Sequence, residues 1–141
     1  MRNLLAMAAF ATAVSWAGCQ SARVRKTDSP PVVAQKGVSE ITPAQARPAV
    51  EAAYVQFVDV RTPAEFAAGH AYRARNIPLD ELMKDLNKLE KNEPVYLICQ
   101  SGNRSKKAAE MLVEAGFPQA VTITGGTEAW KSAGLPMADA K

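Results

Sequence analysis

The sequence is poor in the residue types that build closed metal sites. Its 141 residues include two cysteines, Cys19 and Cys99, and a single histidine, His70. A structural zinc site needs four ligands, most often cysteine and histidine side chains. Two cysteines and one histidine cannot close such a site unaided, so we expect no resident metal.

A strong charge imbalance is also missing. The formal net charge is +3, the basic residues are spread along the chain, and no aromatic residues are interleaved with a basic cluster. Nucleic-acid-binding domains usually gather their basic residues in a patch or stripe. The composition therefore predicts a mixed solvated surface and no nucleic-acid partner. The length and the 48% hydrophobic content suit one domain with one core.

No hydrophobic run is long enough to span a bilayer. The longest apolar run, at positions 4–17, follows Arg2 and has 14 residues, whereas a transmembrane helix needs about 20. A basic start followed by a short apolar stretch is typical of a secretory signal peptide. We therefore expect residues 1–19 to direct export from a bacterium.

The end of this run, Trp16-Ala17-Gly18-Cys19, resembles the lipobox of bacterial lipoproteins. The resemblance implies cleavage before Cys19, a lipid on that cysteine, and a membrane-anchored protein on the periplasmic side. Trp16 departs from the pattern, because an aliphatic residue is usual there. The alternative is ordinary cleavage near Ala17, which would leave a soluble periplasmic protein. If a lipid caps Cys19, Cys99 has no partner for an intramolecular disulfide.

Residues 20–37 are polar, contain proline and lack periodicity, which predicts a flexible linker. We expect the folded domain over residues 38–137. Its β-rich runs lie at 54–60, 94–99 and 121–123. Its helical segments are expected from Thr42-Pro43, from Thr62 to near Gly69, over 80–91, over 103–115 and around Trp130. Strands that alternate with helices predict an α/β fold with a mainly parallel sheet.

Local signals refine these helices. Pro48 is expected to end or kink the first one early, because proline lacks the amide hydrogen that a helix needs. Gly116 is expected to stop the helix that begins at Asn103. Asp59 and Cys99 each end a predicted strand, and in parallel sheets the functional site lies beyond the carboxyl ends of the strands.

The segment 99–105, Cys-Gln-Ser-Gly-Asn-Arg-Ser, leads from a predicted strand into a helix. Such a glycine-containing turn points several backbone N–H groups inward and forms an anion nest at the helix N-terminus. We expect the nest to hold Cys99 as a reachable thiolate, since lowering its pKa by about two units from about 8.5 suffices at neutral pH. Arg104 adds a planar cation for an anionic substrate. The alternative is an inert buried cysteine.

Three ordered motifs resemble the rhodanese family and together extend over about residues 38–137. One is the Cys99 loop, with four residues before Arg104. The others are Asp59-Val-Arg61, Glu65-Phe, Gly69-His70 and Asn76-Ile-Pro78, and then Gly125-Gly126, Ala129-Trp130 and Gly134-Leu-Pro136. Ala71-Tyr72-Arg73 stands where the family usually has Ile-Pro-Gly.

This resemblance implies a rhodanese-like fold with helices on both faces of the sheet, and sulfur transfer without a metal or organic cofactor. The Cys99 thiolate would take the outer sulfur of thiosulfate or another sulfane donor, become a persulfide, and pass that sulfur to cyanide or a thiol. The substrate would be held, largely through backbone N–H groups, by Gln100, Ser101, Gly102, Asn103, Arg104 and Ser105.

Four further residues are expected to support the loop. Asp59 is expected to brace it, and Arg61 and Glu65 to pair with each other, because they are four residues apart. His70 is expected to be a hydrogen-bonded structural residue, with proton transfer as the alternative.

Other readings of the loop stay open. The domain could be a persulfide carrier whose donor and acceptor are proteins. Arsenate or phosphate chemistry is disfavoured, because related phosphatases have five residues between the cysteine and the arginine. Lys106 and Lys107 either form a solvated helix face or attract an anionic donor.

Overall fold

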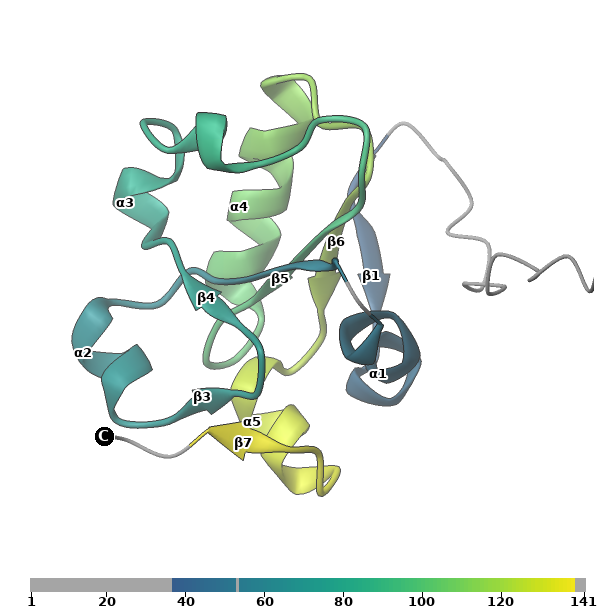
Figure 1. The fold of residues 1–141 in the computed structure, drawn as a ribbon, viewed down its shortest axis with the longest axis vertical. Coiled ribbons are helices and arrows are strands. Elements are labelled where there is room, and N and C mark those ends of the chain that lie inside the picture. The colour runs from purple at the N-terminus through teal and green to yellow at the C-terminus, as the bar shows by residue number, and fades with distance from the viewer. Residues whose placement is uncertain (1–36, 53, 139–141) are drawn as a thin grey trace, which may run out of the picture.

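The computed structural model describes residues 37–52 and 54–138 (Figure 1). The expected signal peptide, Cys19 and all of the expected linker except Gly37 lie outside these residues. In chain order the elements are β1 (Ser39–Ile41), α1 (Pro43–Glu51), β2 (Gln56–Asp59), α2 (Pro63–Ala67), β3 (His70–Ala71), β4 (Arg75–Asn76), α3 (Leu79–Leu82), the 3₁₀ helix η1 (Leu86–Lys88), β5 (Val95–Ile98), α4 (Asn103–Glu114), β6 (Ala120–Ile123), α5 (Gly126–Ser132) and β7 (Met137–Ala138).

Five strands form one parallel sheet in the order β1-β6-β5-β2-β4, which confirms the predicted mainly parallel sheet. β2 and β5 are neighbours, with Asp59 opposite Ile98. The chain therefore brings Asp59 and Cys99 to the same edge, as their positions at strand ends predict. β3 and β7 form a separate antiparallel pair in which His70 lies opposite Ala138. The sequence patterns had not predicted β1, β3, β4 or β7.

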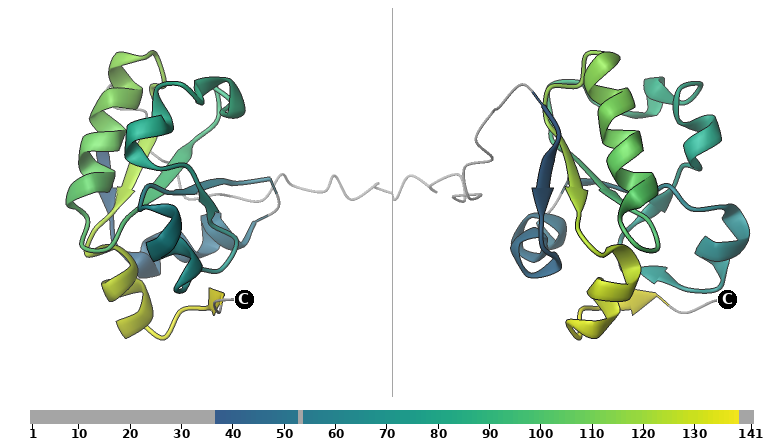
Figure 2. Two further views of the ribbon diagram at one scale, coloured as in Figure 1. Left: turned by 90° about the vertical axis from the view of Figure 1, so that its left-hand side faces the viewer. Right: turned by 180° about the vertical axis from the view of Figure 1, so that it is seen from behind.

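Helices cover both faces of the sheet (Figures 1 and 2), which confirms the rest of the predicted fold class. Alternate residues of one strand feed two separate cores: Leu97 of β5 packs on the face covered by α3 and α4, and Ile98 packs on the face covered by α1 and α5. Trp130 of α5 is buried in this second core. Burial of each such side chain contributes about 1.5–3 kcal/mol.

Helix α1 runs from Pro43 to Glu51, so the expected early end at Pro48 is wrong. A proline removes a single amide donor, and the apolar side of the helix compensates, since Ala46, Ala49 and Val50 are buried. The predicted start is confirmed, because the Thr42 side chain accepts from the first turn and proline follows it.

The continuous helix expected over residues 80–91 is also wrong. The chain forms the four-residue α3, turns at Met83 and Lys84, and then forms the three-residue η1. Leu82 and Leu89 are buried, whereas Met83 is 46% exposed. Two short helices bring the two leucines to the core without a single helical stripe.

The turn at Ala71-Tyr72-Arg73 keeps a glycine-like backbone. Arg73 has φ +69°, the left-handed region that glycine occupies readily, although arginine stands there. The amide of Ala74 donates to Ala71 O over 3.0 Å, and the amide of Tyr72 donates to Pro136 O. Interactions with β7 and the rest of the chain therefore hold a turn that the side chain at this position disfavours.

Helix α4 carries the Cys99 loop at its N-terminus. Its N-cap, Gly102, has φ +104°, and its C-terminus is closed by bonds from Gly116 N to Val113 O and from Phe117 N to Leu112 O. This confirms Gly116 as the helix stop, since the two bonds form a Schellman motif. Of the helices between residues 37 and 138 that the structure describes, none has the length and apolar character needed to cross a bilayer.

Candidate active site

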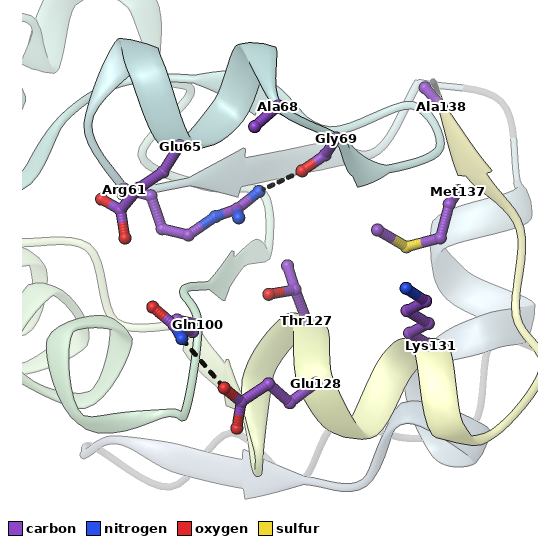
Figure 3. A pocket seen from close by; sticks show the side chains of 10 residues that line it. All are labelled: Arg61, Glu65, Ala68, Gly69, Gln100, Thr127, Glu128, Lys131, Met137 and Ala138. Atoms are coloured by element: carbon purple, nitrogen blue, oxygen red, sulfur yellow. Dashed lines mark hydrogen bonds between the residues drawn. The ribbon is translucent and has the colours of Figure 1, made fainter. Parts of the chain in front are cut away.

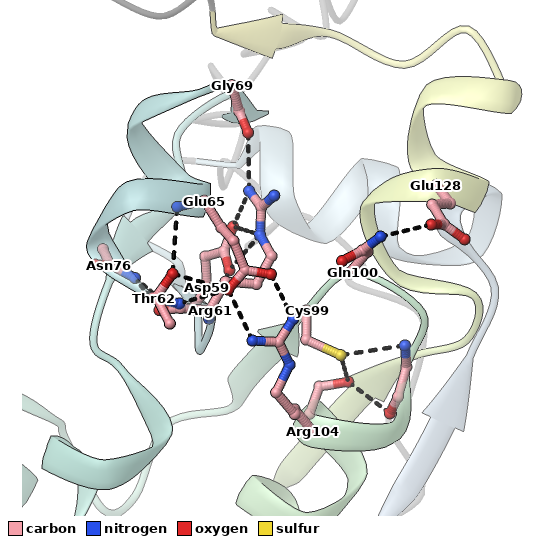
Figure 4. A network of polar contacts seen from close by, with 12 residues as sticks. Asp59, Arg61, Thr62, Glu65, Gly69, Asn76, Cys99, Gln100, Arg104 and Glu128 are labelled. Carbon is pink, nitrogen blue, oxygen red and sulfur yellow. Dashed lines mark hydrogen bonds and ion pairs between the residues drawn. The ribbon is translucent and has the colours of Figure 1, made fainter.

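Cys99 follows β5 directly and lies beneath the first turn of α4 (Figure 4). Its Sγ accepts a hydrogen bond from the Gly102 amide over 3.1 Å and lies 3.6 Å from Ser105 Oγ. Where the sequence predicts several inward-facing amides, Gly102 supplies the only one bonded to this sulfur among the described residues. The ionised state of Cys99 stays a prediction.

The sulfur is also less accessible than expected, since Cys99 is only 1% exposed. The side chain turns toward buried Ser105 instead of toward the surface. A donor can therefore reach Sγ only after the loop or the side chains around it move.

The buried hydroxyl groups of Ser105 and Thr122 fix the loop to β6. Ser105 Oγ donates to Gly102 O over 3.0 Å and shares a 2.7 Å hydrogen bond with Thr122 Oγ1 of β6. Ser105 is fully buried. In this structure it braces the turn and faces Sγ, whereas the sequence placed it among the substrate-binding residues.

The N-terminus of α5 holds the loop from the other side. The amide of Thr127 donates to Cys99 O over 2.7 Å, and the amide of Glu128 donates to Gln100 O over 3.2 Å. This contact needs Gly126, because a Cβ there would collide with the carbonyl groups of Cys99 and Gln100. The Gly125-Gly126 motif is thus part of the site.

Arg104 is held by Glu65 of α2 in a two-bonded ion pair (Figure 4), with distances of 2.8 and 2.7 Å. The predicted Arg61–Glu65 pair is therefore wrong. The hydrogen bond from Arg104, followed by those from Thr62, holds the pKa of Glu65 far below its usual value. The hydrogen bonds that Arg104 donates to Glu65 raise the pKa of Arg104 in turn.

Arg61 pairs with Asp59 instead. Its Nε and Nη2 donate to the Asp59 carboxylate over 2.7–3.0 Å, and Nη2 also donates to Gly69 O. Asp59 is fully buried, and its carboxylate bonds to Arg61 alone among the described residues. The expected contact between Asp59 and the Cys99 loop is absent from that part of the chain, because Asp59 acts on Arg61.

His70 is placed as a structural residue. Its Nδ1 lies 3.0 Å from Phe66 O, and its ring stacks on the Phe66 ring at 3.6 Å between centroids. A carbonyl oxygen only accepts, so Nδ1 carries the proton in this bond. This geometry favours the structural reading over proton transfer.

The exposed residues of the loop face two different places. Gln100 donates from Nε2 to the Glu128 carboxylate over 2.9 Å. Ser101 and Asn103 line a separate, small cavity of about 210 Å³. Lys106 also borders that cavity and pairs with the Glu40 carboxylate over 2.7 Å. The hydrogen bond to Glu40 raises the pKa of Lys106, which keeps the lysine charged and paired with this carboxylate.

A larger groove of about 450 Å³ lies beside Gln100 (Figure 3). We call it the α2–α5 groove, and its lining includes Arg61, Ala68, Gln100, Thr127, Lys131 and Met137. The sequence patterns missed Ala68, Thr127, Lys131 and Met137, because these residues come from separate elements that only the fold brings together. The sequence signals for α5 were Gly125-Gly126 and Ala129-Trp130.

The described residues contain no group of three or more His, Cys, Asp and Glu side chains arranged to hold a metal ion. The polar groups around Cys99 are backbone amides, hydroxyls and ion pairs. These groups can bind an anion and stabilise a charged sulfur by hydrogen bonding.

Comparison with known proteins identifies relatives in sequence and in fold. The model of the rhodanese-like domain family matches residues 42–133. The crystal structure of a rhodanese-related protein from Thermoplasma volcanium has a TM-score of 0.64 and 32% sequence identity, and the match covers 71% of this chain and 97% of that one.

Two curated relatives are similar in sequence. The uncharacterized protein YqhL of Bacillus subtilis is 43% identical over 75 residues, which make up 53% of this chain and 60% of that protein. Thiosulfate sulfurtransferase GlpE of Vibrio cholerae is 33% identical over 88 residues, which make up 62% of this chain and 83% of GlpE. The chain thus matches less than two thirds of the length of YqhL and most of the length of GlpE.

Proposed function

The chain belongs to the rhodanese-like domain family, and we propose that it is a sulfurtransferase that moves sulfane sulfur through a persulfide on Cys99. One observation carries this proposal: Cys99 follows a parallel strand and its Sγ accepts the Gly102 amide at the N-terminus of α4. A helix N-terminus stabilises negative charge, which favours the thiolate.

Sulfur transfer then takes two displacement steps. The Cys99 thiolate attacks the outer sulfur of thiosulfate, a new S–S bond forms, and the S–S bond of thiosulfate breaks with its electron pair leaving on sulfite. The acceptor, a thiolate or cyanide, next attacks the terminal sulfur of the Cys99 persulfide. The S–S bond of the persulfide breaks and its electron pair returns to Cys99 Sγ. Neither step needs an oxidant or a reductant.

Arg104 has two roles in this proposal. Its bonds to Glu65 join α2 to α4, which braces the entrance to the loop. A guanidinium group carries five N–H donors, so those two bonds leave donors for the anionic end of a substrate. The same ion pair offsets part of the positive charge of Arg104, so Arg104 attracts an anionic substrate less strongly than the sequence alone suggests.

Thiosulfate is our first choice of donor. The similarity to thiosulfate sulfurtransferase GlpE of Vibrio cholerae supports it. The four residues between Cys99 and Arg104 support sulfur transfer over arsenate or phosphate chemistry. Hydrolysis of p-nitrophenyl phosphate or reduction of arsenate at a rate above that of sulfur transfer would reverse this choice.

A persulfide carrier that works with protein partners is the second candidate. The burial of Cys99, at 1% exposure, favours it, because a docking protein has a larger contact surface than a small ion with which to open the loop. This candidate predicts slow turnover with thiosulfate and a stable persulfide after exposure to the partner.

We further propose that the domain, residues 38–137, is exported and held on the periplasmic side of a membrane through a lipid on Cys19. The support is the sequence of residues 4–19, which ends in the small residues Ala17 and Gly18 before the cysteine. A coil of about 18 residues reaches roughly 25 Å, so the expected linker would hold the domain just off the membrane surface.

The test of sulfur transfer uses the full chain and its Cys99→Ser variant. The wild-type chain is expected to gain about 32 Da, the mass of one sulfur atom, on Cys99 after exposure to thiosulfate, and to release one sulfite. It is then expected to turn over thiosulfate with cyanide. The Cys99→Ser chain is expected to do neither, because serine forms no persulfide. Equal sulfite release by both chains would refute the proposal.

A further inference from the structure

Thr122 carries a buried hydroxyl group on the apolar side of the sheet. It lies on β6 opposite Leu97 of β5, and Leu97 belongs to the core that α3 and α4 cover. Thr122 is 2% exposed, so burial of its hydroxyl group is unfavourable unless that group is hydrogen-bonded. Valine has the same branched shape without the polar atom, and the packing alone therefore does not explain a threonine at this position.

Ser105 is the partner of this hydroxyl group. Ser105 Oγ lies 2.7 Å from Thr122 Oγ1, and no other group of residues 37–52 and 54–138 bonds to Thr122 Oγ1. A hydroxyl group has one proton to donate. Because Ser105 Oγ is the only acceptor for that proton among those residues, Thr122 is the donor in this bond and Ser105 is the acceptor.

The proton of Ser105 itself has two destinations. Gly102 O lies 3.0 Å from Ser105 Oγ, and Cys99 Sγ lies 3.6 Å from it. Gly102 O also accepts from the amide of Lys106 over 3.1 Å, so this carbonyl group keeps a partner when the Ser105 hydroxyl turns away from it. Ser105 can thus donate to the sulfur without leaving a buried polar group unpaired.

The charge of the sulfur selects between these destinations. A Cys99 thiol donates to Ser105 Oγ while Ser105 donates to Gly102 O. A thiolate only accepts, so the Ser105 proton turns to Sγ and joins the Gly102 amide there. In both states Thr122 is the donor to Ser105. If Thr122 were the acceptor, the Ser105 proton would be held between the two hydroxyl groups and would not reach the sulfur.

From this arrangement we infer that Thr122 is a positioning residue for sulfur transfer, because its hydroxyl group keeps the Ser105 proton free for the sulfur of Cys99. Ser105 touches the reacting atom, and Thr122 acts through Ser105. The inference rests on the proposed function, because it assigns a residue of β6 to that reaction.

The two displacement steps depend on this proton to different extents. A hydrogen bond to a thiolate increases the fraction of thiolate but weakens its attack, so the first step gains only in part. In the second step the S–S bond of the Cys99 persulfide breaks and its electron pair returns to Sγ, where the Ser105 hydroxyl meets the developing charge. A stabilised thiolate leaves faster. Loss of the Thr122 hydroxyl group should therefore slow the second step more than the first.

The experiment measures each step in the full chain. Sulfite release after mixing with thiosulfate reports the first step, and loss of about 32 Da from the preformed persulfide after mixing with cyanide reports the second. Thr122→Val removes the hydroxyl group and keeps the shape, whereas Thr122→Ser keeps the hydroxyl group and removes a methyl group. Thr124→Val is the matched control, because the hydroxyl group of Thr124 bonds to Ile41 O and not to Ser105.

Thr122→Val is expected to slow transfer to cyanide about tenfold and sulfite release about threefold. Thr122→Ser is expected to stay within about twofold of the wild type in both steps, and Thr124→Val to change neither. In a Ser105→Ala chain, Thr122→Val is expected to cause no further slowing, because the residue through which Thr122 acts is missing.

Urea denaturation separates this role from a structural one. The stability is expected to follow the opposite order, since Thr122→Ser leaves a small cavity in the core and Thr122→Val does not. Slowing of Thr122→Ser to the rate of Thr122→Val would show that the hydroxyl group is not what matters, and it would overturn the inference whatever the stability of the valine chain.

The remaining outcomes separate the two proposals. A persulfide that never forms on Cys99 of the wild type overturns the proposed function and this inference with it. A persulfide that forms and discharges at the wild-type rates in Thr122→Val overturns only the inference. Slowing by Thr122→Val that is equally large in the Ser105→Ala chain also overturns only the inference, because Thr122 would then act without Ser105.

Discussion

Single glycines decide how the Cys99 loop lies against α5. Gly126 has φ +59°, and a Cβ there would collide with the carbonyl groups of Cys99 and Gln100. Gly134 has a similar φ of +67°, but a Cβ there would meet nothing within 4 Å. Gly126 and Gly134 therefore have similar left-handed backbones and different surroundings.

Substitution Gly126→Ala is expected to destabilise the fold by about 3 kcal/mol, the sum of left-handed strain and a backbone collision. It is also expected to stop persulfide formation, because the carbonyl groups that must move belong to Cys99 and Gln100. Gly134→Ala is expected to cost only about 1 kcal/mol and to keep the activity. Urea denaturation and the mass gain on Cys99 measure both effects.

Equal losses of stability in the two variants would show that strain alone explains Gly126. Normal persulfide formation in a folded Gly126→Ala chain would show that the contact between α5 and the loop carbonyl groups is dispensable.

Helices α1 and α2 both begin with a capping box, but the residue that accepts from the cap amide is glutamine in α1 and glutamate in α2. In α1, Gln45 Oε1 accepts from the Thr42 amide over 2.9 Å, and in α2, Glu65 Oε2 accepts from the Thr62 amide over 3.0 Å. A glutamine thus performs the cap in α1. The negative charge of Glu65 is not needed for the cap and serves the bond to Arg104 of α4.

The variant Glu65→Gln is expected to keep the α2 cap and to lose the ion pair with Arg104 of α4. This loss lowers the free energy of unfolding by about 1 kcal/mol at pH 7. The folded state lowers the pKa of Glu65, so its contribution is complete above the ordinary glutamate value of about 4.3 and is lost as the pH falls below it. Urea denaturation should therefore show that the free energy of unfolding falls less between pH 7 and pH 3 in the variant than in the wild type.

Glu51→Gln is the matched control, because it removes an exposed pair with Arg47 within α1. Its effect is expected to stay at about 0.3–0.5 kcal/mol. Parallel stability profiles for Glu65→Gln and the wild type across this pH range would contradict the assigned role of the Glu65 charge.

At the scale of the whole molecule, the site depends on two cores on opposite faces of one sheet. On one face, α4 packs against Cys99 in the first core. On the other face, amides of α5 donate to the carbonyl groups of the loop, and α5 packs in the second core. The expected anchor at Cys19 lies outside this assembly, beyond the described residues. Anchoring and sulfur transfer are therefore expected to be separable.

The Cys19→Ser chain, produced in a bacterial host, is expected to move from the membrane fraction to the soluble periplasmic fraction and to keep its sulfur transfer. The Cys99→Ser chain is expected to stay in the membrane fraction without activity. Fractionation and intact-mass measurement of both chains check this. A wild-type chain found soluble, with Gly18 as its first residue, would support cleavage after Ala17 instead of lipidation.

Sequence alone determined the features that depend on neighbouring residues. The caps at Thr42 and Thr62, the stop at Gly116, and the positions of Asp59 and Cys99 at strand ends follow from local backbone chemistry and hydrophobic patterning. Alternating strands and helices then leave few arrangements besides a parallel sheet covered on both faces. These predictions held because each rests on contacts only a few residues apart.

Tertiary structure alone decided which charged groups pair and how far the sulfur is covered. Arg61 and Glu65 have the spacing of an ion pair, yet packing turns Arg61 toward Asp59 and brings Arg104 to Glu65 from 39 positions away. The α2–α5 groove and the burial of Cys99 likewise arise where separate elements meet. The physical reason is that a long charged side chain can satisfy several partners, and only the positions of distant elements in the folded chain select one.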